Sequence, residues 1–343
     1  MKILSSLTVF LLSIIFTYKA EALPAFPEDY EKKRVFVSTD IGGGDQDDYQ
    51  SLVHLLLYHD MFDLEGIIAS YPEVGRSWWR SIMASYRIDY KKLSLFSADY
   101  LPPRELQKRF KLGSKSKFRG NNPSAGANLL IKQALKDDPR PLHVLVWGSA
   151  TDLAQALKQK PAIAKNIRVF IIGGWNTAQD RAAFEFVENM QKRKKFKMIV
   201  TGYRGGETGR GIYLTGLHSK RKYGNVGFVK RVVKKHGSLG RAFHANSSRI
   251  NVNRYGIKMG DTPSVFYVMN GSFKFDKKTT PPSWGGRYCR VRKNFYADCL
   301  NRKKFNLGSR YKGAKTISTH RRDYLKDFEE RLKRLKGLDG ITP

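Results

Sequence analysis

Short apolar runs alternate with amphipathic stretches through the first half of the chain, and this alternation limits the fold more than any other feature. Four runs read as strands, at 35–39, 64–70, 141–149 and 167–174. Three stretches with apolar residues at helical spacing lie between them, at 48–60, 124–138 and 150–166. Apolar strands separated by helices are typical of a parallel sheet covered on both sides. We therefore expect an α/β fold, with an open, mostly parallel sheet and helices on both faces.

A single domain is the domain organisation that we expect for residues 23–343. The chain has 343 residues, of which 41% are hydrophobic, and it contains no internal repeat and no low-complexity linker. Its last third is rich in Gly, Pro, Tyr and Arg, which we interpret as a C-terminal extension from about residue 285. A charged helix from about His320 to Lys336 should end it as a solvated surface element. The sequence leaves open a homo-oligomer.

The first 22 residues have the features of a signal peptide. Lys2 precedes an apolar stretch over 7–16, and the small-x-small triplet Ala20-Glu21-Ala22 follows it. A stretch of roughly ten apolar residues is short for a ~30 Å hydrocarbon core, which disfavours the alternative of an uncleaved anchor. No later segment reaches transmembrane length. We expect cleavage near Ala22 and a secreted or periplasmic protein that begins at Leu23.

The two cysteines, Cys289 and Cys299, lie ten residues apart in a basic segment. In an exported protein a disulfide between them is plausible, because oxidising compartments preserve such bonds. Two free thiols are the alternative.

Basic residues far outnumber acidic ones, with 63 Lys and Arg against 30 Asp and Glu, for a net charge of +33. Such a charge attracts polyanions or an anionic envelope surface without specificity. The chain has no zinc-finger or leucine-zipper spacing and no repeat of aromatic and basic residues, which disfavours specific nucleic-acid recognition.

An acidic glycine loop follows the first predicted strand, in the segment 39–48 (TDIGGGDQDD). It carries Asp40, Asp45, Asp47 and Asp48, and ligands of parallel sheets bind at this edge. Four carboxylates so close repel one another unless a cation compensates, and a calcium ion prefers oxygen ligands of this kind. The alternative is a solvated turn that caps the next helix.

Four segments in order resemble the nucleoside hydrolase superfamily, and more closely its exported branch, the nucleoside-hydrolase-like domain of some bacterial cellulose-binding-type proteins. They are TDIGGGDQDDYQSL (39–52), LVWGSATDLAQAL (145–157), FIIGGWNTAQDRAAF (170–184) and KMGDTPSVFYVMNG (258–271).

The resemblance implies a calcium-dependent hydrolase of N-ribosyl or related glycosidic bonds, acting on a small-molecule riboside or other glycoside. Asp40, Asp48 and Asp261 would be side-chain ligands of the ion, and Trp147 would offer its carbonyl. Asp47 would be the general base that activates water. Asn176 would hydrogen-bond the sugar or the charge that develops on it.

The chain also departs from the pattern of this family. Ser38 stands where the family starts with Asp, and the loop to Asp47 is three residues longer. Gly260 stands where purine-releasing members have His, and Gly174 replaces an acidic sugar contact. These departures leave open an alternative function, a carbohydrate- or polyanion-binding module without chemistry.

Aromatic and glycine-rich segments give further candidates for substrate binding. Trp78 and Trp79 follow the second predicted strand, where a loop would face the ligand, although adjacent aromatics also serve packing. Trp284 and Arg287 could point at the same pocket, or could form a glycine turn packed by aromatics. The segment 206–211 (GETGRG) lacks the Lys of a phosphate loop and is interpreted as a flexible surface segment.

Overall fold

The computed structural model describes residues 30–44, 47–70, 72–120, 122–213, 221–247, 256–273, 275–300 and 303–336. The expected signal peptide and Asp45 lie outside these ranges. Within them, no helix combines the length and apolar character needed to cross a membrane.

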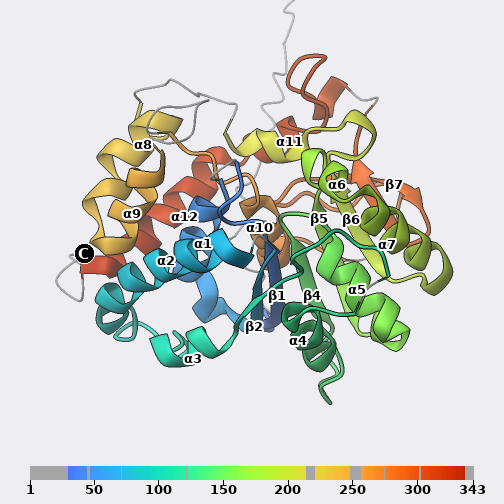
Figure 1. Cartoon of the computed structure of the whole chain (residues 1–343). Coiled ribbons are helices and arrows are strands. Elements are labelled where there is room, and N and C mark those ends of the chain that lie inside the picture. The colour runs from blue at the N-terminus through green and yellow to red at the C-terminus, as the bar shows by residue number, and fades with distance from the viewer. Residues whose placement is uncertain are drawn as a thin grey trace, which may run out of the picture.

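One eight-stranded sheet with the order β3-β2-β1-β4-β5-β6-β8-β7 forms the centre of the molecule (Figure 1). Its strands are β1 (Lys33–Thr39), β2 (Phe62–Ala69), β3 (Phe110–Leu112), β4 (Leu142–Val146), β5 (Ile167–Ile172), β6 (Lys197–Thr201), β7 (Tyr288–Arg292) and β8 (Phe295–Asp298). All neighbouring strands are parallel except β7 and β8, which form an antiparallel hairpin. The expected α/β class with a mostly parallel sheet is confirmed.

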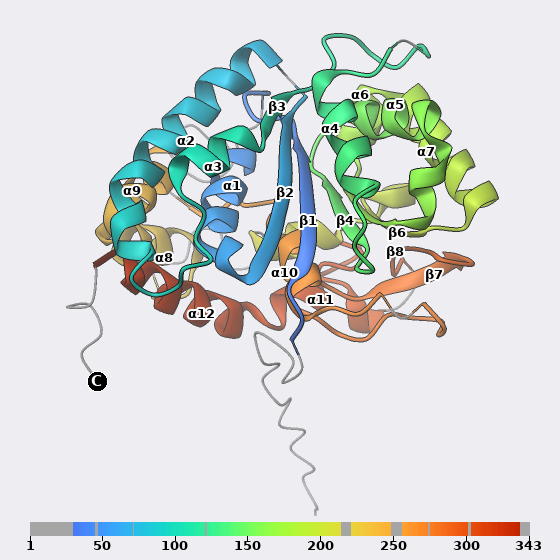
Figure 2. The same ribbon diagram turned by 90° about the horizontal axis from the view of Figure 1, so that it is seen from below.

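Helices cover both faces of this sheet, as the view along its edge shows (Figure 2). One face carries α1 (Asp47–Tyr58), α2 (Pro72–Leu93), α9 (Gly237–Ser247), α10 (Thr262–Asn270) and α12 (Arg321–Lys333). The opposite face carries α4 (Ala125–Ala134), α5 (Thr151–Gln159) and α7 (Arg181–Lys194). Short helices complete the chain, namely α3 (Pro103–Lys108), α6 (Trp175–Gln179), α8 (Asn225–Arg231) and α11 (Lys315–Ser318).

Burial on both faces explains why the central strands read as continuous apolar runs. In β1, Val35 and Val37 pack into one core cluster and Phe36 packs into the other, and all three are fully buried. Since β1 is parallel to both β2 and β4, the loops that follow these strands meet at one edge of the sheet.

The prediction that the C-terminal helix is a solvated surface element is wrong for one side of the helix. Its position agrees with α12, but Tyr324, Leu325 and Phe328 are fully buried against the core. Arg331 is also buried and pairs with Asp60, 2.5 Å from its Oδ1. The helix is therefore part of the core on one side (Figure 2).

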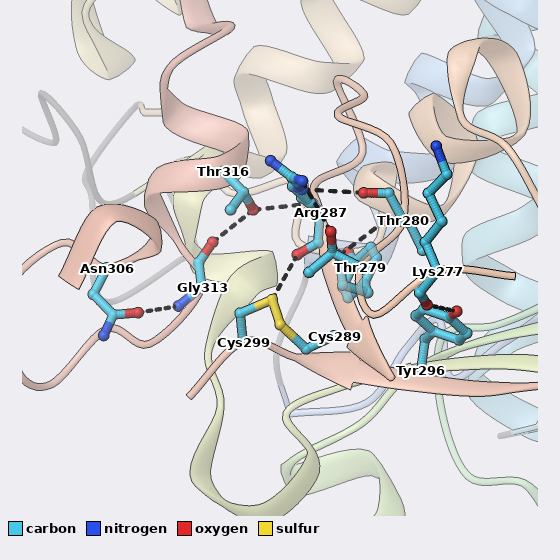
Figure 3. The surroundings of a disulfide bond; sticks show 11 residues. Lys277, Thr279, Thr280, Arg287, Cys289, Tyr296, Cys299, Asn306, Gly313 and Thr316 are labelled. Atoms are coloured by element: carbon cyan, nitrogen blue, oxygen red, sulfur yellow. Dashed lines mark hydrogen bonds between the residues drawn. A yellow bond between two sulfur atoms is a disulfide. The ribbon is translucent and has the colours of Figure 1, made fainter. Parts of the chain in front are cut away.

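The segment interpreted as a C-terminal extension adds two strands to the sheet, because β8 pairs with β6 and carries β7 at the edge. A disulfide joins Cys289 in β7 to Cys299, which directly follows β8 (Figure 3). The bond therefore closes this hairpin at the end away from its turn.

Candidate functional site

A cavity of about 450 Å³ lies at the carboxyl edge of the sheet. Its walls come from the loop after β1 and the start of α1, from the segments after β5 and β6, and from Gly260 before α10. Every one of these segments follows a strand or opens a helix, which is where α/β sheets place their ligands.

Three carboxylates meet beside this cavity. Asp47, Asp48 and Asp261 each offer an oxygen, and these oxygens lie within 4.8 Å of one another. Asp47 and Asp48 open α1, and Asp261 is the residue before α10, more than 200 positions later in the chain. The backbone N–H of Asp261 donates to the Ser51 hydroxyl of α1 at 3.3 Å, which ties the two helix starts together.

Asp48 is buried at the centre of these acids, with 2% of its surface exposed. It accepts a hydrogen bond from the Thr39 hydroxyl at the end of β1. Burial, followed by the charges of Asp40, Asp261 and Asp47, raises the pKa of Asp48 well above its usual range. A cation between these carboxylates would remove the repulsion, since an opposite charge favours the ionised form.

Asp40 stands on the adjacent side of the cavity and is 7% exposed. Gln179 donates to its Oδ2 at 2.8 Å and to Asn176 Oδ1 at 3.1 Å. A Cβ at residue 148 would lie 2.6 Å from the Asp40 Cβ, so only glycine allows this close approach of the β1 and β4 loops.

Asn176 uses its amide group to hold two backbone carbonyls. Its Nδ2 donates to the Trp147 carbonyl at 2.6 Å and to the Ile172 carbonyl at 3.1 Å. The Trp147 indole donates to Ser264 Oγ at 2.7 Å, and this hydroxyl donates to the Asp261 carbonyl at 2.7 Å. The Trp147 carbonyl and the Asp261 backbone are therefore positioned by one connected set of hydrogen bonds.

Of the six residues that the sequence singled out for a metal and for catalysis, three carboxylates lie within 4.8 Å of one another, and hydrogen bonds connect Asp40, Asn176 and Trp147 to Asp261. The oxygen atoms that they offer are carboxylates and a carbonyl, which are the donors that calcium prefers in proteins. The donor chemistry of the site therefore fits a hard divalent cation.

Trp78 and Trp79 do not line the acidic cavity, which corrects the expectation that they face the ligand. Trp78 and Trp79 belong to α2, which extends over a segment expected to be a loop. Trp79 is buried and stacks on Phe110 with a centroid distance of 4.9 Å, and Trp78 packs edge-on against Tyr49 at 5.4 Å. None of them lines the acidic cavity.

Trp284 and Arg287 do not line the cavity either, and this expectation is corrected too. Trp284 is 2% exposed and packs on Phe266 at 5.7 Å. Arg287 donates to the Thr280 carbonyl and to Thr279 Oγ1 next to the disulfide (Figure 3). The alternative of a glycine turn packed by aromatics describes this segment.

The wall that follows β6 was missed in the sequence. Glu207 and Arg210 line the cavity from the segment expected to be a flexible surface. Asp298 holds this wall, because it accepts the backbone N–H groups of Tyr203 and Thr208 at 3.1 and 2.9 Å. The apolar run 198–200 followed by Gly202 is the signal that would have identified both β6 and this loop.

Trp175 was also missed, although it directly precedes Asn176. It lines the cavity and is 81% exposed, which places an indole ring at the mouth of the site. Its position after β5 follows from the topology, but nothing in the sequence distinguishes an exposed Trp from a buried one.

Comparisons with known proteins agree with this architecture. Residues 34–288 match the family model described as cellulose-binding Sde182, nucleoside hydrolase-like domain. Among curated proteins no relative matches the chain.

Several solved structures share the fold. A nucleoside hydrolase-related hypothetical protein from Saccharophagus degradans, associated with carbohydrate metabolism, is 23% identical with a TM-score of 0.65, over 89% of this chain and 72% of that chain. An inosine-guanosine nucleoside hydrolase is 13% identical with a TM-score of 0.50, over 86% and 99% of the two chains. The type III effector protein XopQ, solved with adenosine diphosphate ribose, is 10% identical with a TM-score of 0.50, over 90% and 94%.

These identities show a shared fold, and the family match extends over most of the chain. The protein belongs to the family of cellulose-binding Sde182-type, nucleoside hydrolase-like domains.

Proposed function

We propose that the protein is a calcium-dependent glycosidase that hydrolyses an N-ribosyl or related glycosidic bond. The observation that carries this proposal is the meeting of Asp47, Asp48 and Asp261 within 4.8 Å beside a cavity at the carboxyl edge of the sheet. Inosine, guanosine and adenosine diphosphate ribose, named for two proteins of the same fold, all contain ribose. A small-molecule riboside or another glycoside is therefore the proposed substrate.

The proposed ligands of the ion are the side chains of Asp40, Asp48 and Asp261 and the carbonyl of Trp147. When bound, the ion would lower the pKa of a coordinated water and orient the sugar hydroxyls. Asn176 supports this arrangement, because its Nδ2 holds the Trp147 carbonyl at 2.6 Å.

Asp47 is the proposed general base. It lines the cavity and is only partly buried, so its carboxylate can reach a water molecule above the other acids. Asn176 Oδ1 accepts from Gln179 and keeps one lone pair for a sugar hydroxyl, while its Nδ2 donates to two backbone carbonyls. Gly174 and Gly260 bring no side chain that could protonate a leaving group, which favours substrates whose leaving group needs little assistance.

The remaining expectations belong to the same proposal. The mature domain would extend from residue 23 to 343 and reach a secreted or periplasmic compartment after cleavage near Ala22. A homo-oligomer and a non-specific contact with anionic envelope surfaces are compatible with it.

A non-catalytic carbohydrate- or polyanion-binding module on the same scaffold is the second candidate. It is favoured by Gly174 and Gly260 in the cavity, by the net charge of +33 and by the cellulose-binding description of the family.

Turnover of p-nitrophenyl riboside in the presence of calcium distinguishes the two candidates. We expect measurable release of nitrophenolate by the wild-type protein, and a loss of about 100-fold or more in Asp47→Asn because proton abstraction is removed. Calorimetry should show that Asp47→Asn still binds calcium. Wild-type rates in this variant would contradict the proposed role of Asp47.

A further inference from the structure

A second groove, of about 510 Å³, lies between α2 and the edge strand β3. We call it the basic groove. It is lined by Arg76, Arg80, Arg87 and Lys111, together with Trp79, Gln107, Phe110, Leu112 and Ala125. Four of its lining residues carry a positive charge, and no lining residue is acidic.

Three of these cations form one row on α2. At 100° per residue, Arg76, Arg80 and Arg87 lie within about 40° of one another around the helix and extend over about 16 Å of its axis. All three side chains are exposed. Within the described part of the chain, no ion pair involves them or Lys111.

This excess of charge is a local property of the groove and does not simply reflect the net charge of the chain. A third cavity, of about 310 Å³ at the start of β2, is lined by equal numbers of cations and acids. They are Lys32, Arg109 and Lys136 with Asp63, Glu65 and Asp99. Carboxylates lie beside the cations there, whereas no acidic residue lines the basic groove.

A middle cavity of about 320 Å³ lies between the basic groove and the acidic site. It shares Gln179 with the acidic cavity. Its other walls are Val74 on α2 and Ser114 after β3, which continue the two elements that line the basic groove. It contains two cations, Lys115 and Lys117, and two acids, Glu73 and Asp180, and Lys115 pairs with Glu73 at 3.0 Å. Among these cavities, the unbalanced positive charge is therefore confined to the basic groove.

We propose that the basic groove binds a linear anionic polysaccharide with regularly spaced carboxylate or sulfate groups. A row of guanidinium groups suits such a ligand, because each can form a bidentate contact with a planar or tetrahedral oxyanion. The binding requires neither an ion nor Asp47, so it goes beyond the glycosidase proposal.

Charge distinguishes this ligand from neutral polysaccharides, and the lack of exposed rings in the groove distinguishes it from single-stranded nucleic acids, which are also polyanions. Both of those are held largely by stacking on exposed rings. The aromatic residues of the groove are Trp79 and Phe110, which are 1% and 8% exposed and stack on each other. Their faces are covered, so only the charged groups of a ligand can be recognised.

The test compares two variants that each lose three positive charges. The groove variant combines Arg76→Ala, Arg80→Ala and Arg87→Ala. It removes all three positive charges of the row, and alanine preserves the helix. The control combines Arg193→Ala, Arg322→Ala and Lys326→Ala, which are exposed cations of α7 and α12. Calorimetry with short polygalacturonate chains at low ionic strength, on wild-type protein and both variants, measures the affinity.

We expect the groove variant to lose about tenfold or more in affinity and the control about twofold or less, with all binding weakened by salt. An equal loss in both variants would overturn the proposal, because it would show attraction by net charge alone. Stronger groove-dependent binding of a thymidine oligonucleotide than of polygalacturonate would overturn the choice of polysaccharide. We also expect Asp47→Asn to bind polygalacturonate as the wild-type protein does. This measurement separates polysaccharide binding from riboside turnover, so failure of one proposal does not decide the other.

Discussion

Gly260 controls the position of the Asp47 carboxylate. A Cβ at residue 260 would lie 2.4 Å from Asp47 Oδ2, closer than any side chain tolerates. According to the sequence resemblance, purine-releasing relatives carry His at this position. Here the Asp47 carboxylate occupies the space that such a side chain would need. The absence of a side chain at residue 260 is a condition for this acid cluster.

The first prediction concerns this contact. Gly260→Ala should displace the Asp47 carboxylate and lower riboside turnover by about tenfold or more, because a misplaced base loses its alignment. Thermal unfolding should change little, since a flexible carboxylate can move. Gly209→Ala is the matched control, because its Cβ would have its nearest neighbour, the Gly260 carbonyl oxygen, at 3.6 Å in the same cavity. Equal turnover in the two variants would contradict the account.

Asp298 gives a prediction about pH. Burial raises its pKa to about 6, although the N–H groups of Tyr203 and Thr208 stabilise the charged form. A folded-state pKa above the ordinary value of 3.8 means that protonated Asp298 stabilises the fold below about pH 4, and that this contribution is lost as the pH rises through 6.

We therefore expect the free energy of unfolding of wild-type protein, relative to Asp298→Asn, to fall by about 2–3 kcal/mol between pH 4 and pH 7. Urea unfolding of both proteins at the two pH values measures this difference. A difference that stays constant over this range would show that the carboxyl titrates normally in the folded state.

Among the elements, those with a clear apolar period were predicted from the sequence. The units β1-α1-β2 and α4-β4-α5-β5 agree with the expected segments to within a few residues. The helix α2 was missed because Gly75 and two adjacent Trp residues interrupt its period, and β3 was missed because it has only three residues. Charged residues in β7 and α12 concealed their buried positions, since a pattern of sequence does not show which charges are paired.

The buried pair between α12 and the core gives an element-level prediction. Arg331 is 6% exposed, and its guanidinium lies 2.5 Å from Asp60 and 4.7 Å from the ring centre of Tyr58. Arg331→Ala should lower the free energy of unfolding by about 3 kcal/mol, because it weakens the compensation of a buried carboxylate. Lys326→Ala on the exposed side of α12 should change it by about 0.5 kcal/mol or less. Similar effects of both changes in urea unfolding would mean that α12 contributes little to the core.

At the scale of the whole molecule, the topology explains why distant acids could be assigned to one site from the sequence. Parallel strands place their following loops at one edge, so Asp40 and Asp48 after β1 and Asp261 before α10 could be expected there. The wall formed by Glu207 and Arg210 could not, because the strand before it had not been identified. Aromatic residues were misassigned because exposure depends on the packing of the complete chain.

The distribution of charge is the other property of the whole molecule. The chain carries a net charge of +33 around a cavity with an acidic cluster, so anionic ligands are attracted to the surface and repelled by the carboxylates themselves. A bound cation would reverse the second effect. Bound calcium is therefore a condition for an anionic substrate to approach Asp47.

Calorimetric titration of calcium into a protein that begins at Leu23 tests the proposed metal site most directly, with Asp261→Asn as the control. We predict binding of one ion per chain, and an affinity lowered about 100-fold or more in the variant, because a charged ligand of a hard cation is lost. Circular dichroism should show that both proteins are folded. Absence of binding by the folded wild-type protein would contradict the metal site and leave the acidic loop as the cap of α1.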